Sequence, residues 1–441
     1  MTTEQLYQIY LKHPVISTDT RKIAPGSLFF ALKGDKFDAN TFAGQAVAAG
    51  AAYAIIDNPA YQHGDHYILV NDVLTALQDL ARHHRRQLTI PIVGLTGTNG
   101  KTTTKELINA VLSQRFNTYA TQGNLNNHIG VPLTILSINA NHEAAVIEMG
   151  ANHQKEIELL CTISQPTHGL ITNVGKAHLE GFGGVEGVKK GKGELYDFMK
   201  ATNGITFVDS DSADLMAMQF ARSLKNVVMY GSIDLENLVS GQLTENSPYL
   251  GLQWTNNQTG ESYDVKSQLT GAYNLDNILA AICIGAYFKL TPAEINAGVS
   301  GYQPKNNRSQ ITKTATNTLI CDYYNANPSS MFVAIENLGK LEAKHKVLVL
   351  GDMFEMGDES AAEHEAVIRK ALETDVDEVI FVGSEFFAMS PEVRKSESPE
   401  AVFYSTVEQA IAALRDEPIK DSTVLIKGSR GMALERLVEL F

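Results

Sequence analysis

The sequence predicts an α/β protein of three domains: a small N-terminal α/β domain, a central domain with a mostly parallel sheet, and a C-terminal Rossmann-like domain. Its 441 residues exceed what one hydrophobic core usually organises. Short apolar strands alternate with helical patterns through the second and third parts of the chain. A glycine-rich loop also joins a strand to a helix. We expect the domains to cover residues 1–86, 87–304 and 305–441.

The first domain begins as a small α/β unit. Strands are expected at Ser27–Leu32 and Ala52–Ile56, with a helix in the alanine-rich stretch between them. The basic run Arg82–Arg86 closes a further helix before Pro91. Such a run is typical of a solvated helix end, and we expect it to face water.

The central domain shows the alternation most clearly. The polar stretch 232–266 lacks it, which predicts an antiparallel excursion, and a linker is expected near 301–307. The predicted strands are Ile90–Leu95, Ala144–Glu148 and Gly169–Asn173, and the predicted helices are Lys101–Leu112 and Asn277–Phe288.

The third domain repeats the strand–helix alternation without a glycine loop. This pattern predicts a second doubly wound unit. Its predicted strands are Leu319–Tyr323, Val347–Leu350, Glu378–Val382 and Thr423–Ile426.

Composition narrows the class of protein. Fifty acidic against 36 basic residues give a net charge of −14, which argues against nucleic-acid and anionic-membrane binding. Three widely separated cysteines do not fit a disulfide framework or a thiolate zinc site. The N-terminus does not resemble a signal peptide, and no apolar stretch is long enough for membrane insertion. We expect a monomeric cytoplasmic protein.

The loop Gly97-Thr98-Asn99-Gly100-Lys101-Thr102-Thr103 carries the clearest chemistry. Its glycines let successive N–H groups face a phosphate, and the helix N-terminus adds partial positive charge. Lys101 would reach the terminal phosphates and Thr102 would offer a hydroxyl to Mg²⁺. Leu95 occupies the place of the first glycine in the strict pattern, so the motif is a shifted version. These residues make the central domain a phosphate-loop domain.

Two further groups follow strands of the same predicted sheet. Glu148 ends one strand and could ligate Mg²⁺, although an ion pair is equally compatible with the residue alone. His178 follows the next strand, where a lone histidine is more often structural. Because parallel strands end at one edge of a sheet, we expect both side chains near the loop.

Together these motifs resemble the Mur ligases of peptidoglycan synthesis, and the resemblance covers essentially the whole chain. The residues that carry it are GTNGKTT at 97–103, Glu148-Met149-Gly150, NVGKAHLEGF at 173–182, Lys192-Gly193-Glu194, Ser17–Arg21, Arg308-Ser309-Gln310, Asp322–Pro328 and Gly351–Gly357.

The resemblance implies an ATP-dependent, carbon–nitrogen bond-forming ligase that works through an acyl phosphate. The run GNLNNHIGVPLT from Gly123 and the triplet Asn325-Ala326-Asn327 favour the member that adds D-alanyl-D-alanine to UDP-N-acetylmuramoyl-tripeptide. Whether the third peptide residue is diaminopimelate or lysine stays open.

The family also implies roles for individual residues. Lys101, Lys192, His178 and Arg308 are expected to be catalytic. Two Mg²⁺ ions would be held by Thr102 and Glu148, and by His178 with Lys192 after CO₂ has converted its amine to a carbamate. The expected ATP contacts are Gly97, Thr98, Asn99, Gly100, Lys101, Thr102, Thr103, Asn274, Asn277, Arg308 and Asp322; the expected substrate contacts are Ser17, Asp19, Thr20, Arg21, Asn124, Asn126, Asn127, Asn325 and Asn327.

Three other readings stay open at this level. A diaminopimelate- or lysine-adding ligase, or one like folylpolyglutamate synthase, would share the phosphate loop. A phosphate-loop switch or motor would hydrolyse ATP without an amino-acid substrate. A non-catalytic nucleotide-binding partner would not need Lys101 and Glu148. For Lys192 the alternative is that it forms one solvated basic turn with Lys189 and Lys190.

Overall fold

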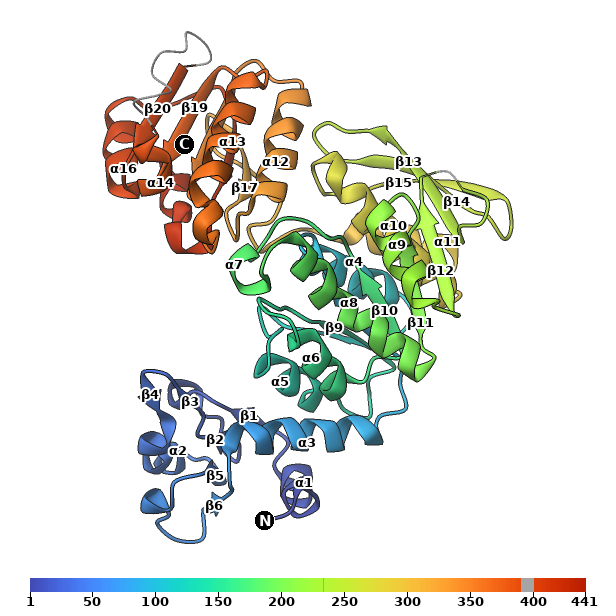
Figure 1. Cartoon of the computed structure of the whole chain (residues 1–441), viewed down its shortest axis with the longest axis vertical. Helices are drawn as coiled ribbons and strands as arrows, with labels where there is room; N and C mark the ends of the chain where they lie inside the picture. Colours follow the sequence, from blue (N-terminus) through green and yellow to red (C-terminus); the bar gives the residue numbers. More distant parts are fainter. Residues whose placement is uncertain (233, 390–399) are drawn as a thin grey trace.

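The computed structural model describes residues 1–232, 234–389 and 400–441. Three main sheets follow one another along the chain, and the parts that carry them lie one after another from one end of the molecule to the other (Figure 1). We call the parts that carry them the N-terminal unit (residues 3–87), the central unit (residues 92–301) and the C-terminal unit (residues 308–441). The predicted α/β fold class is confirmed.

The N-terminal unit has a four-stranded parallel sheet in the order β1-β2-β5-β6. The strands expected near 27–32 and 52–56 are present as β2 and β5, and a small hairpin, β3–β4, stands apart from the sheet. The elements are α1 (Thr3–Lys12), β1 (Ile16–Ser17), η1 (Thr20–Lys22), β2 (Leu28–Phe30), β3 (Lys33–Gly34), β4 (Phe37–Asp38), η2 (Ala39–Phe42), α2 (Ala43–Ala48), β5 (Tyr53–Ile56), η3 (Pro59–Tyr61), β6 (Tyr67–Leu69) and α3 (Val73–Gln87).

Helix α3 joins this unit to the central one. The expectation of a solvated basic end is wrong for His84 and Arg85, whereas Arg86 is exposed as expected. Arg85 and His84 are each only 7% exposed. The Arg85 guanidinium donates to the carbonyls of Ser164 and Gln165 at 2.8 Å each. These carbonyls lie at the C-terminal end of α6, where the helix leaves them without intrahelical partners. The basic run therefore fixes one unit on the next.

The central unit has a nine-stranded sheet in the order β15-β14-β13-β12-β11-β10-β7-β9-β8. β13 to β15 pair antiparallel, as the polar stretch predicted, whereas the other strand pairs are parallel. The strands are β7 (Ile92–Thr96), β8 (Thr118–Ala120), β9 (Ala144–Glu148), β10 (His168–Ile171), β11 (Ile205–Asp209), β12 (Val227–Gly231), β13 (Val239–Glu245), β14 (Gly251–Asn256) and β15 (Glu261–Lys266).

The helices of the central unit cover both faces of this sheet. Helix α4 follows β7 directly and packs against α10 and α11. At Gly298 on α11, an added Cβ would lie 2.5 Å from the Val111 Cα of α4, so the two helix backbones are in close contact. The helices are α4 (Lys101–Leu112), α5 (Gly130–Leu136), α6 (Glu156–Ser164), α7 (Leu179–Phe182), α8 (Val185–Thr202), α9 (Ala213–Arg222), η4 (Ala272–Asn274), α10 (Leu275–Tyr287) and α11 (Pro292–Gly301).

The C-terminal unit has a six-stranded sheet in the order β16-β17-β21-β18-β19-β20, parallel except at β16. The four predicted strands are present, and β16 and β20 extend the sheet at its two edges. The elements are β16 (Gln310–Lys313), β17 (Thr318–Asp322), α12 (Pro328–Lys340), β18 (Lys346–Gly351), η5 (Gly357–Glu359), α13 (Ser360–Glu373), β19 (Glu378–Val382), α14 (Ser384–Ala388), β20 (Glu400–Tyr404), α16 (Val407–Asp416), β21 (Thr423–Lys427), η6 (Arg430–Met432) and η7 (Leu434–Leu440).

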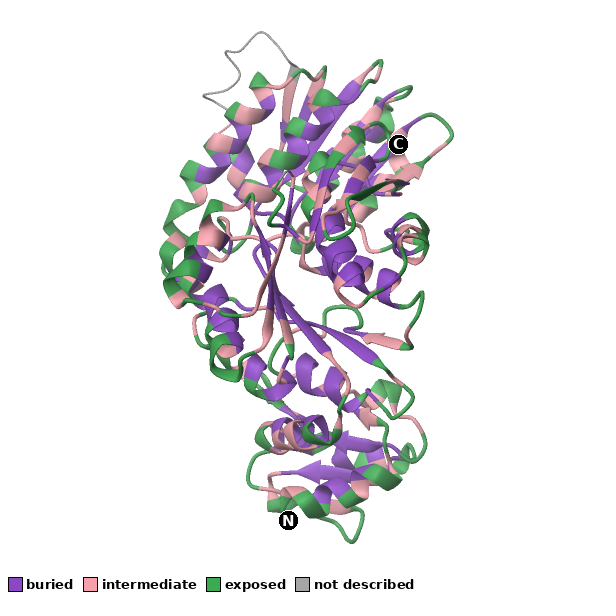
Figure 2. Ribbon diagram, turned by 90° about the vertical axis from the view of Figure 1, so that its right-hand side faces the viewer, coloured by how far each residue is buried: buried purple, intermediate pink, exposed green. Residues whose placement is uncertain are grey.

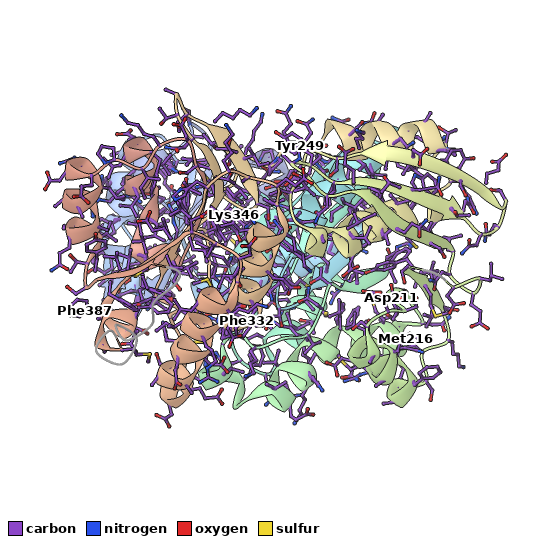
Figure 3. The ribbon with its side chains drawn as sticks, turned by 90° about the horizontal axis from the view of Figure 1, so that it is seen from above. Asp211, Met216, Tyr249, Phe332, Lys346 and Phe387 are labelled. Atoms are coloured by element: carbon purple, nitrogen blue, oxygen red, sulfur yellow. The ribbon has the colours of Figure 1, made fainter. Side chains whose placement is uncertain are left out.

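Burial follows the layering. The central strands of each sheet are buried and the outer helix faces are exposed (Figure 2). Seen from above, Phe387 on the C-terminal unit and Met216 on the central unit lie at opposite sides of the molecule (Figure 3). Within the described ranges no helix combines the length and apolar character needed to cross a bilayer.

Candidate active site

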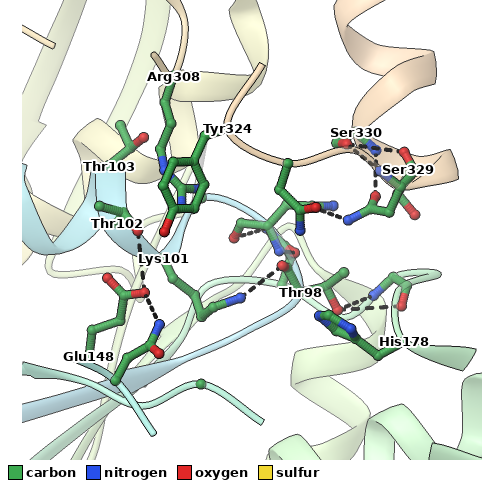
Figure 4. A pocket seen from close by; sticks show the side chains of 18 of the residues that line it. Thr98, Lys101, Thr102, Thr103, Glu148, His178, Arg308, Tyr324, Ser329 and Ser330 are labelled. Carbon is green, nitrogen blue, oxygen red and sulfur yellow. Dashed lines mark hydrogen bonds between the residues drawn. The ribbon is translucent and has the colours of Figure 1, made fainter. Parts of the chain in front are cut away.

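A cavity of ≈ 720 Å³ lies where the carboxyl ends of β7, β9 and β10 face the C-terminal unit (Figure 4). Its position agrees with the rule that ligands of parallel α/β sheets bind at the carboxyl ends of the strands. Most of the predicted site residues line it: Thr98, Asn99, Gly100, Lys101, Thr102, Thr103, Asn124, Asn126, Asn127, Glu148, His178, Asn274, Asn277, Arg308, Asp322, Asn325 and Asn327.

The phosphate loop is shaped by two glycines that no other residue could replace without movement. Gly97 has φ 149° and Gly100 has φ 74°. A Cβ at Gly97 would lie 2.0 Å from the Thr172 hydroxyl, and one at Gly100 would lie 2.5 Å from the amide oxygen of Asn277. Gly97 therefore lies on the side of the loop that packs against Thr172, and its own atoms do not line the cavity.

Lys101 begins α4, and its side chain folds back over the preceding loop (Figure 4). Its ammonium donates to the carbonyls of Gly97 at 2.8 Å and Thr98 at 3.0 Å. Burial lowers its pKa to about 8, and the nearby Glu148 carboxylate partly opposes that shift. An anion in the loop would be a stronger acceptor than two carbonyls, so this side chain is available to a phosphate.

Glu148 ends β9 with a carboxylate that is only partly satisfied. Oε1 accepts the Thr102 hydroxyl at 3.3 Å and the Asn126 amide at 2.9 Å. Oε2 is buried and has no hydrogen-bond partner among the described residues. A buried, unpartnered carboxylate oxygen beside a threonine hydroxyl suits Mg²⁺, which takes few protein oxygens and shares phosphate oxygens. In the described ranges no cluster of three or more His, Cys, Asp or Glu could hold a metal alone.

Lys192 is buried, not part of a solvated turn. Its side chain on α8 is 2% exposed, donates to the Ala151 carbonyl at 3.1 Å, and lies 4.9 Å from the centre of the Phe182 ring. Burial, followed by the charge of Lys101, holds its pKa well below the ordinary value. Lys189, by contrast, pairs with Asp214 at 2.9 Å. Lys192 lies behind the cavity wall and does not line it.

The asparagines on the adenine side expected from the sequence form an internal network. Asn277 accepts the Thr104 hydroxyl at 2.9 Å and donates to Asn274 at 2.9 Å. Asn274 in turn donates to the Thr270 carbonyl at 2.8 Å. The Tyr273 hydroxyl forms a hydrogen bond with the Ser309 hydroxyl at 2.8 Å. The network links α4, α10 and the segment that enters the C-terminal unit.

The C-terminal unit contributes the opposite wall. Arg308 stacks on Tyr324, with its guanidinium carbon 4.0 Å from the ring centre, and its Nε is buried without a hydrogen-bond partner in the described ranges. Asp322 accepts from the Ser309 amide at 3.3 Å and from Lys427 at 2.7 Å. Lys427 is 2% exposed, and our sequence reading missed it. Its signal is a lysine that ends an apolar strand.

Four further contacts between described residues join the two walls. Asn327 donates to the Asn99 side chain of the phosphate loop at 2.8 Å. The Lys176 amide donates to the Ser329 hydroxyl at 2.9 Å, and its ammonium pairs with Glu363 at 2.5 Å. His178 contacts Glu355 through Nδ1. The cavity is therefore enclosed by residues more than a hundred positions apart.

The residues expected to hold the uridine end lie elsewhere. Ser17, Asp19, Thr20 and Arg21 belong to the N-terminal unit and do not line the nucleotide cavity. Arg21 pairs with Asp19 at 2.8 Å, and the Ser17 hydroxyl donates to the Asp19 carbonyl at 3.0 Å. A substrate that touches both places must reach from one unit to the next.

Fold and cavity together define a phosphate-loop protein in which two α/β units share the cavity beside that loop. Known families support this independently: the Mur ligase middle domain matches residues 95–285, the Mur ligase glutamate ligase domain 307–430, and the Mur ligase family catalytic domain 14–85. The chain belongs to the Mur ligase family.

Individual relatives are similar over nearly the whole length. The UDP-N-acetylmuramoyl-tripeptide–D-alanyl-D-alanine ligases of Escherichia coli K12 and Bacillus subtilis 168 are 36% and 33% identical, each over 96% of this chain and 92% of the relative. A MurF crystal structure from Acinetobacter baumannii superposes with a TM-score of 0.88 at 30% identity, covering 99% of this chain and 98% of that one. MurF ligase from Thermotoga maritima in complex with ADP gives 0.83 at 26% identity, covering 98% and 97%.

Proposed function

We propose that this chain is the ATP-dependent ligase that joins D-alanyl-D-alanine to UDP-N-acetylmuramoyl-tripeptide. One observation carries the proposal: the cavity places the phosphate loop and the half-satisfied Glu148 opposite Arg308 of a second unit. Such a site can hold a nucleotide and a second reactant away from water. The near-full-length similarity to ligases of that name selects the substrates.

The chemistry required of the residues follows from the reaction. A carboxylate is a poor electrophile, and ATP supplies a phosphoryl group that turns it into an acyl phosphate open to attack by an amine. The protein must position the reactants and neutralise charge on the transferred group. We assign neutralisation to Lys101 from the central unit and to Arg308 from the C-terminal unit. We assign Asp322 to the ribose, and Asn274 and Asn277 to the base side.

Two Mg²⁺ positions are part of the proposal. Thr102 and Glu148 would hold the first, which would neutralise phosphate charge. His178 and Lys192 would hold the second, provided that the lysine amine has reacted with CO₂ to give a carbamate. The burial and lowered pKa of Lys192 support this, because only an unprotonated amine can attack CO₂.

The remaining assignments concern the substrates. We assign the uridine end to Ser17, Asp19, Thr20 and Arg21, and the peptide end to Asn124, Asn126 and Asn127, which line the cavity from the loop after β8. Asn325 and Asn327 would contact the dipeptide. We further propose that the enzyme acts as a monomer in the cytoplasm on peptidoglycan precursors.

The test is ATP turnover with UDP-linked muramyl peptides, each assayed with and without D-alanyl-D-alanine. ADP release that requires both substrates, with an amide product of the matching mass, would support the proposal. Lys101→Ala, which removes one charge contact in the transition state, should lower the rate roughly a hundredfold to a thousandfold. ATP hydrolysis without either substrate would favour a switch or motor instead.

A further inference from the structure

A short turn after β10, residues 173–176, contacts both walls of the large cavity. On the side of the phosphate loop, the Gly175 amide donates to the Thr98 hydroxyl at 2.9 Å, and the Thr98 amide donates to the Asn173 carbonyl at 3.0 Å. The Asn99 amide donates to the Asn173 side chain at 2.9 Å. Because these hydrogen bonds join the two segments, the turn and the phosphate loop are held in a fixed relative position.

On its other side the same turn contacts the C-terminal unit. The Lys176 amide donates to the Ser329 hydroxyl in the first turn of α12 at 2.9 Å. Gly175 lies between the two units, since an added Cβ would lie 2.8 Å from the Ser329 hydroxyl oxygen and 3.6 Å from the Thr98 methyl group. The turn is therefore in direct contact with the phosphate loop and with the C-terminal unit at the same time.

The Lys176 side chain adds an ion pair across this boundary. Its ammonium lies 2.5 Å from the Glu363 carboxylate of α13. The Glu363 side chain is 8% exposed, and Lys176 is its only ion-pair partner among the described residues. Without Lys176 this carboxylate would be buried and unpaired, which is unfavourable. Separation of the two units would then let water replace the lost ammonium, so the open arrangement would be favoured.

We propose that Lys176 and Glu363 are positioning residues whose ion pair, with the hydrogen bond from the Lys176 amide to Ser329, holds the C-terminal unit on the phosphate loop. Neither residue of the pair lines the ≈ 720 Å³ cavity, so the pair acts through groups that it brings there, such as Arg308. The effect of the pair on the reaction rate rests on the proposed function, whereas its effect on the position of the C-terminal unit does not.

Single-turnover formation of the acyl phosphate measures the effect on rate. Lys176→Met removes the charge and keeps a chain of similar length. It should lower this rate roughly 5- to 30-fold, because a hydrogen-bonded charge pair is lost from the closed arrangement. Equilibrium affinity for ADP should stay within about threefold of native, which also shows that the variant is folded. Lys176→Arg keeps the charge and should stay near the native rate.

Charge reversal tests whether Glu363 is the partner. Lys176→Glu should be at least as impaired as Lys176→Met, since two carboxylates then face each other. Lys176→Glu combined with Glu363→Lys restores opposite charges and should regain most of the native rate, although each single change lowers it. Lys340→Met is the matched control, because Lys340 forms an exposed ion pair with Glu336 within α12 at 2.6 Å. This control should keep the native rate.

The position of the C-terminal unit is measured apart from the reaction. The three native cysteines are buried, so spin labels on Lys200→Cys and Lys344→Cys, at two exposed positions, report the distance between the central and C-terminal units. In the ADP-bound protein, Lys176→Met should add longer distances to the distribution. Lys340→Met should leave the distribution native, and the reversed pair should restore it.

The outcomes separate this inference from the function. A native rate and a native distance distribution in Lys176→Met would overturn the inference. A lowered rate with a native distribution would also overturn it, because Lys176 would then act on the chemistry and not on the position of the unit. Failure of the reversed pair to recover either quantity would exclude Glu363 as the partner. If native enzyme forms no amide product, the proposed function is wrong, and the distance distributions alone decide the inference.

Discussion

At the scale of single residues, the site contains buried polar groups that lack some of their hydrogen-bond partners in the described part of the chain. Glu148 Oε2 and Arg308 Nε are both buried without hydrogen-bond partners in the described part of the chain, although such atoms usually have one. Lys101 is satisfied only by carbonyls of its own loop. These residues line one cavity. A bound phosphate would accept hydrogen bonds from Lys101 and Arg308, and a bound cation would be coordinated by the Glu148 carboxylate.

Lys192 gives a prediction at this scale. If its amine works as a carbamate, activity should fall in CO₂-depleted buffer and recover when bicarbonate is added. Lys192→Ala should be inactive yet bind ATP, because the side chain does not line the nucleotide cavity. The neighbouring, exposed Lys190 is the matched control: Lys190→Ala should behave like native enzyme. Labelling with ¹³C-bicarbonate should give a carbamate signal, and full activity without CO₂ would contradict the assignment.

Asp209 gives a second prediction at this scale, which concerns the stability of the folded protein. Burial, followed by the charge of Asp276, raises its pKa to about 7. The folded protein therefore holds this proton more tightly than the unfolded chain, where aspartate titrates near about 3.9. The destabilisation grows as the pH rises between these values and is complete above the folded pKa. Asp209→Asn should raise the Tm by about one degree at pH 8, an effect on the order of 1 kcal/mol, and by much less at pH 4.5. Equal shifts at both pH values would contradict this.

At the scale of elements, the strands and helices nearest the glycine loop were the most predictable. The helix 101–112 and the strand 144–148 have the bounds expected. β7 and β10 were each displaced by a residue or two, because strand ends depend on pairing with neighbours. The strands β8, β11, β12, β16 and β20 and the helix α11 were not predicted. β16 and β20 are edge strands with weak patterns of their own, and α11 is held by packing on α4.

The burial of Arg85 could not be predicted for the same kind of reason. A run of basic residues predicts exposure to solvent as long as its hydrogen-bond acceptors are unknown. The carbonyls that accept from Arg85 lie at the end of α6, almost eighty residues away in the sequence. Lys427 was likewise missed as a site residue, since its partner Asp322 comes from another element. The sequence therefore predicted the phosphate loop and the groups at strand ends, but it did not predict hydrogen-bond partners that are distant in the sequence.

Glu194 gives a prediction for one element. It belongs to the Lys192-Gly193-Glu194 motif, yet its carboxylate caps α6, accepting the amides of Lys155 at 2.6 Å and Glu158 at 2.9 Å. Glu194→Ala should cost about 1–2 kcal/mol, as loss of a helix cap does. Amide hydrogen exchange over residues 155–158 should quicken. Glu158→Ala, whose side chain is 55% exposed, is the control and should leave that exchange unchanged.

At the scale of the whole molecule, three units are held together differently. The N-terminal and central units are joined by α3, which packs on α5 and α6. The buried Tyr10 of α1 adds a contact, since its hydroxyl donates to the Leu136 carbonyl at 2.6 Å. The central and C-terminal units meet mainly around the cavity, through Asn99–Asn327 and Lys176–Glu363. Polar contacts of that kind suit an interface that opens and closes. The domain limits at 86/87 and 304/305 stay a prediction.

Because the interface between the central and C-terminal units consists mainly of polar contacts, we expect the two walls of the cavity to act at different steps of the reaction. The central unit holds the phosphate loop, so we expect it to bind ATP whether or not the C-terminal unit is in place. Arg308 and Asp322 can reach the same nucleotide only when the two units are in contact, as they are in this structure. Closure would then complete the charge neutralisation and exclude water from the acyl phosphate.

Arg308 tests that division. Arg308→Ala should leave ATP affinity within a few-fold of native while lowering the rate of acyl-phosphate formation roughly a hundredfold, because its contact is made in the closed, reacting state. Asp322→Asn should instead raise the KM for ATP. Equilibrium nucleotide binding and single-turnover chemistry, measured on both variants, separate the two effects. If Arg308→Ala weakened binding as much as rate, the arginine would be a ground-state contact, and ATP would have to bind to the closed form from the start.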